Sequence, residues 1–149
     1  MPAVTFNLYD KYRNNNFNGG GVDFTNPVTA AIKMSVMTGA YTPNQNTDET
    51  WASISANEVS GTGYLANGNQ CDNGTSTVDG AGLVTVDADD PAVWGQDASG
   101  FSNGRSCVLH EVSSGQLIGY SSDFGADQGN LNGDFFVAFG VSGILVSTR

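Results

Sequence analysis

Positive charge is scarce in this sequence. Its 149 residues contain five Lys and Arg against fifteen Asp and Glu, so the net charge is −10. Nucleic acids and anionic membrane surfaces are bound by positive side chains placed opposite their phosphates. After Lys33 the remaining cations are Arg105 and Arg149. The composition therefore argues against nucleic acid and membrane as partners, and it predicts an acidic surface that keeps the protein dispersed.

Long apolar runs are also missing. No segment approaches the roughly 18 consecutive apolar residues that a membrane-spanning helix requires. The first six residues, Met1 to Phe6, contain neither the positively charged region nor the apolar region of a secretory signal. We therefore expect the protein to be synthesised in the cytoplasm of a host cell.

The residues from which many catalytic sites are built are few. His110 is the single histidine, so a Ser-His-Asp triad has one possible base. The sequence has no phosphate-binding GxxxxGK[ST] loop, no Gly-x-Gly-x-x-Gly unit and no CxxC motif. A two-carboxylate glycosidase leaves little positional signature and stays an alternative. We expect no enzymatic activity, no catalytic residues and no cofactor.

Two other groups of residues are candidate sites. Asp87, Asp89 and Asp90 place three carboxylates within four residues, and calcium accepts clustered oxygen ligands. The glutamate that ends an EF-hand loop is missing, so we expect Asp90 to begin a turn at Pro91 and no metal to bind. Cys71 and Cys107 are expected to be free, buried thiols, with a disulfide as the alternative.

Turn-forming residues dominate the composition, with twenty glycines and charged residues at 13%. This favours a mainly β chain, an antiparallel two-sheet β-sandwich or flattened barrel with a short N-terminal helix, in a single domain of residues 1–149. The pattern predicts a helix at about 5–18 capped by Thr5, and the sandwich at about 22–149. Within the sandwich we expect strands at 28–38, 75–78, 83–86, 104–112 and 115–121, a short helix at 48–57, a loop-to-strand segment at 58–65, and a closing hairpin of 133–139 with 144–147.

Aromatic residues suggest two kinds of role. Trp51, Ile54 and Trp94 are predicted to face the core, although an exposed tryptophan could stack on a sugar ring. Near the N-terminus, aromatic residues alternate with cations and form the one mildly basic segment. We interpret this segment as the candidate partner-binding surface, the alternative being a helix packed on its own domain with two solvated cations. Its residues are Phe6, Tyr9, Lys11, Tyr12 and Arg13.

A series of short motifs runs through residues 6–147. In order they are LYDKYR at 8–13, AIKMSVMT at 31–38, YTPN at 41–44, SANEVSGTGY at 55–64, DADD at 87–90, LIGY at 117–120, DFG at 123–125, NGDF at 132–135 and GIL at 143–145. In this order and spacing the chain resembles a family of small virion proteins of tailed bacteriophages. The asparagines at 14–16 and the two cysteines depart from the pattern expected of that family.

The resemblance implies a non-enzymatic structural protein, and it transfers no catalytic residues to this chain. It implies a capsid decoration or cement protein on the surface of the virion head, bound to the major capsid protein. Binding to a repeating shell favours a homo-oligomer, and we expect a trimer. A tail, neck or baseplate component is the alternative within virions. A carbohydrate-binding β-sandwich module and a small hydrolase are the alternatives from other classes.

Overall fold

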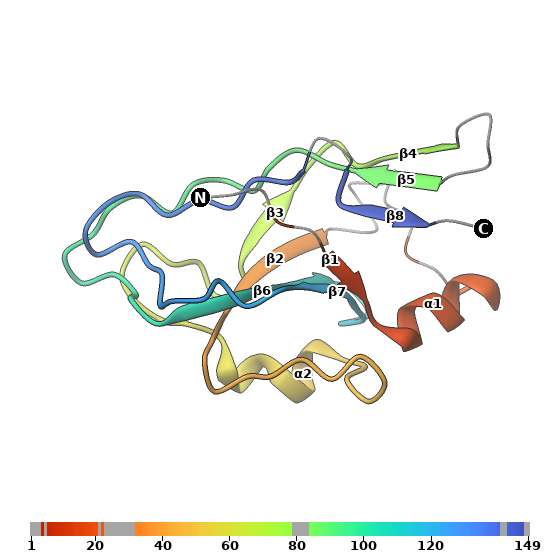
Figure 1. Ribbon diagram of the computed structural model, residues 1–149, viewed down its shortest axis with the longest axis horizontal. Coiled ribbons are helices and arrows are strands. Elements are labelled where there is room, and N and C mark those ends of the chain that lie inside the picture. Colours follow the sequence, from red (N-terminus) through yellow and green to blue (C-terminus); the bar gives the residue numbers. More distant parts are fainter. Residues whose placement is uncertain are drawn as a thin grey trace.

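The structure, a computed structural model, describes residues 4, 6–20, 22, 32–78, 84–140 and 143–147. The expectations for Thr5, for residues 28–31, for the linker 79–82 between two predicted strands and for residue 83 therefore lie outside the described residues. The elements are shown in Figure 1. In chain order they are β1 (Phe6–Leu8), α1 (Asp10–Phe17), β2 (Ile32–Thr38), α2 (Trp51–Ile54), the 3-10 helix η1 (Ser55–Asn57), β3 (Asn69–Cys71), β4 (Thr75–Val78), β5 (Val84–Asp87), β6 (Gly104–Glu111), β7 (Leu117–Ser121) and β8 (Leu145–Ser147).

The strands form two antiparallel sheets. The larger sheet has the order β1-β7-β6-β2-β3, and the smaller has the order β4-β5-β8. The smaller sheet lies on one side of the larger, and α2 lies on the other side (Figure 1). The mainly β prediction is thus confirmed in its sandwich form, and the described strands do not close into a barrel. Among the described residues, no helix has the length and apolar character needed to span a bilayer.

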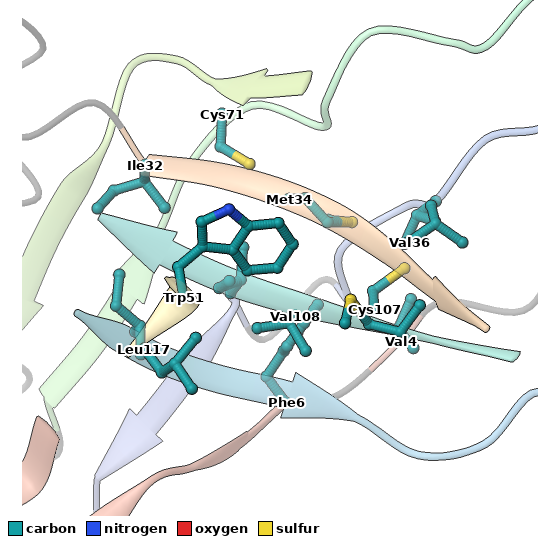
Figure 2. Packing of buried hydrophobic residues seen from close by; sticks show 14 of the residues in the cluster. Val4, Phe6, Ile32, Met34, Val36, Trp51, Cys71, Cys107, Val108 and Leu117 are labelled. Atoms are coloured by element: carbon teal, nitrogen blue, oxygen red, sulfur yellow. The ribbon is translucent and has the colours of Figure 1, made fainter. Parts of the chain in front are cut away.

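The core sits around the two central strands of the larger sheet. Met34 of β2 pairs with Leu109 of β6, and Ser35 pairs with Val108, so neighbouring pairs point to opposite faces. All four side chains are buried, which means that the sheet is covered on both faces. Figure 2 shows buried side chains of this sheet, among them Met34 and Val108 from its two faces. The sequence of β2 alternates between apolar and polar residues from Ile32 to Val36, yet the polar Ser35 is also buried, so the alternation does not mark an exposed face.

The predicted N-terminal helix is half wrong. Residues 6–8 form β1, which pairs with β7 through Phe6 opposite Ser121, and α1 begins only at Asp10. The spacing of Phe6 and Tyr9 fits a helix, but it also fits a strand followed by a helix. Pairing with β7 satisfies the backbone groups of residues 6–8 along that strand, so tertiary context decides between the two structures.

The predicted closing hairpin is also wrong. β8 pairs with β5, with Leu145 opposite Val86, whereas Phe135 forms a bridge with Trp94. Gly143 has φ +85°, and the amide of Ile144 donates to the carbonyl of Val86, so the chain is directed to β5 before a local hairpin can form. These partners are far apart in sequence and cannot be identified from a local pattern.

The predictions for segments that are neighbours along the chain were more accurate. The hairpins β4–β5 and β6–β7 and the helical segment within 48–57 are confirmed. In the 58–65 segment, Glu58 forms a single bridge with Met37 and no strand follows. The sequence signal missed β3, whose residues Asn69–Cys71 are mostly polar. β3 is positioned by Gly68, which has φ +74° and whose α-carbon lies so close to β2 that an added Cβ would be 2.0 Å from the Met34 carbonyl oxygen.

Candidate functional site

The aromatic half of the predicted partner-binding surface is buried. Phe6, Tyr9 and Tyr12 all belong to the hydrophobic core, and Tyr9 has no exposed surface. The Tyr9 hydroxyl lies 2.6 Å from the Tyr41 hydroxyl. Burial raises the pKa of Tyr9 well above its ordinary value, so the phenol stays neutral. These aromatic side chains therefore hold β1 and α1 on the domain, and they do not present a surface to a partner.

The cationic half of that surface is exposed on α1. The Lys11 ammonium lies 3.6 Å from a Glu49 carboxylate oxygen, and the Arg13 guanidinium lies 3.9 Å from Asp10. Each of these side chains keeps about half of its surface in solvent, and such exposed pairs contribute little to stability. The surface is therefore a mixed-charge strip in place of the basic, aromatic patch that the sequence suggested.

Arg105 is a third cation that is engaged within the chain. Its guanidinium donates two hydrogen bonds to Asp123, at 3.2 and 2.8 Å, and lies 3.5 Å from Asp127. These hydrogen bonds hold the pKa of Asp123 below its ordinary value. Lys11, Arg13 and Arg105 thus each face a carboxylate, and the acidic residues in excess shape the electrostatics of the described surface.

His110 is enclosed in the core and is not placed to act in catalysis. Its ring stacks on Trp51 with centroids 4.2 Å apart and an angle of 4°, and Nε2 lies 3.1 Å from the Ser35 hydroxyl. Among the described residues, neither ring nitrogen is hydrogen-bonded to a carboxylate, so His110 lacks the group that orients the base of a triad. Burial lowers the pKa of His110 to about 4. The side chain is a neutral, packed element of the sheet.

Glu111, the residue that follows His110, is held by hydrogen bonds within a turn. Glu111 accepts hydrogen bonds from the backbone amides and the hydroxyls of Ser113 and Ser114. These donors favour the charged form and lower the pKa of Glu111, against the opposing effect of burial. Glu111 therefore stabilises the turn between β6 and β7, and both of its carboxylate oxygens are engaged in these hydrogen bonds.

The two tryptophans are not available to stack on a sugar. Trp51 and Trp94 are both buried, as predicted. The Trp51 indole donates to the side chain of Asn67 at 2.9 Å, and the Trp94 ring stacks on Tyr64 with centroids 5.9 Å apart. A sugar-binding platform needs an exposed aromatic face, so neither residue supports the carbohydrate-binding alternative.

The carboxylates at 87–90 point to separate partners. Asp87 accepts from the amide of Ala88, Asp89 accepts from the side chain of Asn73, and Asp90 accepts from the amide of Phe139 at 2.7 Å. Residues 88–93 form no turn, so the turn expected at Pro91 is wrong, and Asp90 instead ties this segment to a distant one. Among the residues that the structure describes, no three His, Cys, Asp or Glu side chains gather in a way that could hold a metal ion.

Cys71 and Cys107 are free and buried, as expected. They lie on opposite sides of β2, Cys71 opposite Ile32 and Cys107 opposite Val36. Four residues of strand span about 13 Å, so the two α-carbons are far beyond the roughly 7 Å limit for a disulfide. Burial raises the pKa of Cys71 to about 12 and raises that of Cys107 as well, which makes both thiols unreactive.

Two exposed features were not predicted from the sequence, an uncharged edge strand and an apolar pair. The first is β4, in which all four side chains are exposed, including Val78 at 68%. The second is the pair Val93 and Phe136, which flank the bridge between Trp94 and Phe135 and are also exposed. Phe135 and Phe136 are consecutive, so in an extended chain one of them faces outward, and this was the available signal.

Comparison of the chain with protein-family models, with curated proteins and with solved structures gives no match.

Proposed function

We propose that the chain is a non-enzymatic structural protein of a tailed-bacteriophage virion, a decoration or cement protein that binds the major capsid protein on the head. The observation that carries the proposal is the ordered series of motifs between residues 6 and 147, which resembles that class of protein. In this proposal the chain acts as a homo-oligomer, and a trimer suits the three-fold positions of a shell.

A rigid domain supports this role, because a protein that coats a shell must present one surface to many equivalent sites. Asn130 illustrates the rigidity. Its buried side chain accepts from the amide of Phe101 at 2.9 Å and donates to the carbonyl of Gly95 at 2.8 Å. The Asn130 amide donates to the carbonyl of Phe101 as well. One asparagine therefore fastens two long loops beside the core.

A second network fixes the loop between α2 and β3. The Glu58 carboxylate accepts from the Tyr64 hydroxyl at 2.8 Å and from the amide of Asn67 at 3.1 Å. The same Tyr64 hydroxyl accepts from the amide of Val36 in β2 at 2.9 Å. The loop is thus hydrogen-bonded to the central sheet, and its shape is set before any partner arrives.

The net charge of −10 also suits this role. A virion protein accumulates in a cell rich in nucleic acid before assembly, and an acidic exterior reduces non-specific adhesion to polyanions. The mixed-charge strip at Lys11 and Arg13 is our candidate contact with the shell, because its two cations are exposed and their weak pairs with Glu49 and Asp10 can exchange for carboxylates of the shell.

The decisive experiment is cryo-electron microscopy of purified phage particles with quantification of the copy number of this chain. A decoration protein is expected at hundreds of copies per particle on the head. Tens of copies or fewer, at the neck, tail or baseplate, would replace the decoration role with the alternative virion role. Absence of the chain from purified particles would overturn the proposal.

The contact strip is tested with the double variant Lys11→Gln/Arg13→Gln, which lowers the net charge by two. We expect lower occupancy on undecorated heads and no change in the thermal midpoint, since both side chains are exposed. Leu65→Glu/Ala66→Glu lowers the net charge equally at exposed positions elsewhere and serves as the matched control. Equal losses for both variants, or unchanged occupancy for the first, would contradict the assignment of this strip.

A further inference from the structure

The smaller sheet ends in a strand, β4, whose side chains no described part of the chain covers. β4 lies at the edge of the order β4-β5-β8, and Thr75, Ser76, Thr77 and Val78 are each exposed. It runs along the outer margin of the molecule (Figure 1). An edge strand presents unpaired backbone donors and acceptors, which form a template for another strand.

The edges of the larger sheet, unlike β4, are contacted by other parts of the chain. Next to β1, Val4 forms a parallel bridge with Phe139, and its amide donates to the carbonyl of Ala138. At β3, the Asn69 side chain donates to the carbonyl of Ala92 at 2.6 Å. Other parts of the chain thus contact both outer strands of the larger sheet, whereas β4 has β5 as its strand partner.

β4 also lacks the features that usually prevent pairing between edges. It contains no lysine and no proline, and its register with β5 is regular from Thr75–Asp87 to Val78–Val84. Its residues are β-branched or hydroxyl-bearing and uncharged. Asp72 and Asp79 flank β4 in the sequence, but β4 itself carries no charge, so pairing of two copies through it sets no like charges directly opposite each other in the paired strands.

We propose that two copies of the chain associate by antiparallel pairing of β4 with β4 of the partner subunit. Each Thr75 then lies opposite Val78 of the partner subunit, and the two three-stranded sheets become one continuous six-stranded sheet. Asp87 sits on β5 beside Thr75. Antiparallel pairing keeps the two Asp87 carboxylates at opposite ends of the joined strands, while parallel pairing would place them at the same end.

The strand is short, so the association is weak and depends on concentration. Four residues per copy bury less surface than a standard stable interface. Added salt is expected to strengthen the pairing, because it screens the repulsion between two acidic bodies without weakening an uncharged contact. Reciprocal β4 pairing is two-fold and closes at two copies, so it is a separate contact from the one that would form the trimer proposed for the shell. It does not depend on the virion role and applies to the purified protein in solution.

The test compares two variants by sedimentation velocity over a range of concentrations. Thr75→Lys/Val78→Lys places like charges opposite each other in the antiparallel register, and we expect dimer formation to weaken roughly two- to thirtyfold. Thr75→Glu/Val78→Lys places opposite charges together in that same register, and we expect it to associate as well as the unmodified chain. Leu65→Lys, also at an exposed apolar position, is the control and should not change association.

The outcomes separate clearly. Parallel pairing sets each residue opposite itself, so the Glu/Lys variant would then place like charges together and associate as weakly as the Lys/Lys variant. That result would overturn the antiparallel register. A chain that stays monomeric at all concentrations and salt levels would overturn the proposal. A dimer or trimer whose stability is the same in both double variants would overturn it as well, since another surface would then hold the copies together. Thermal unfolding of each variant checks that the fold is intact.

Discussion

The two sheets of this protein lie in opposite environments, and the inner strands β2 and β6 of the larger sheet are also longer than any strand of the smaller one. In the larger sheet, Met34, Ser35, Val108 and Leu109 are all fully buried, on both faces of β2 and β6. In the smaller sheet, every residue of β4 is exposed and every residue of β5 is half-buried. The larger sheet therefore accounts for most of the hydrophobic stabilisation, and the smaller sheet is free to change its surface at little cost in stability.

Gly68 lies where the chain enters β3 of the larger sheet, and the Gly68→Ala substitution has the largest expected effect. The new Cβ would lie 2.0 Å from the Met34 carbonyl oxygen, at φ +74°. β3 would have to move away from β2, and we expect a loss of about 4 kcal/mol or more in the free energy of unfolding, measured by urea denaturation.

Gly19→Ala is the matched control for that prediction. Gly19 has φ +77°, and nothing lies within 4 Å of the added Cβ. Its loss of about 1 kcal/mol reports the backbone conformation alone. Equal losses at the two positions would show that the close approach at Gly68 does not matter.

The next comparison sets one apolar residue in each sheet against the other. Leu109→Ala removes a fully buried side chain from β6, and we expect a loss of about 3 kcal/mol. Val78→Ala removes a side chain that is 68% exposed from β4, and we expect a change below about 0.5 kcal/mol. Both values come from chemical denaturation, and similar losses would show that the smaller sheet contributes to the core more than its exposure indicates.

Lowering the pH is expected to destabilise the larger sheet, because the buried His110 lies on β6 of that sheet. The pKa of His110 is about 4 in the folded state against an ordinary 6.5, so the unfolded chain binds the proton first as the pH falls. Stability present above pH 6.5 is therefore lost as the pH approaches 4, by about 3 kcal/mol for a full shift of this size. His110→Gln should flatten the stability profile in this window, and an unchanged slope would assign the loss to other groups.

The loops beside the core are stabilised by hydrogen bonds more than by buried apolar surface. Asn130→Ala leaves the Phe101 amide and the Gly95 carbonyl without their side-chain partner, and we expect a loss of about 2 kcal/mol. Asn46→Ala, at an exposed asparagine, is the control and should change stability by less than about 0.5 kcal/mol. Hydrogen exchange at the Phe101 amide should accelerate in the first variant, and unchanged protection there would contradict the role given to Asn130.

Prediction from the sequence succeeded where both partners are close along the chain. The hairpins β4–β5 and β6–β7 each pair neighbouring segments, and turn residues separate them. It failed at β1 and β8, which pair with β7 and β5 across long intervals. A short segment such as residues 6–8 fits both a helix and a strand, and the distant partner makes the choice.

The candidate site shows the same division. Lys11 and Arg13 are exposed on a helix, as the pattern indicated, but Phe6, Tyr9 and Tyr12 turn inward. The sequence alone could not separate an aromatic residue that packs from one that binds, because both need the same side chain. The exposure of β4 had no sequence signal either, since a run of Thr, Ser and Val suits a covered strand as well as an open one.

The sequence by itself determined the acidic charge, the mainly β class and the local hairpins, because composition and short-range pattern act within a few residues. Tertiary structure alone decided which charges are paired, which aromatics are buried and which edge is open. Apart from the Arg13–Asp10 pair within α1, these outcomes depend on segments that are distant along the chain and meet only when the sheets assemble.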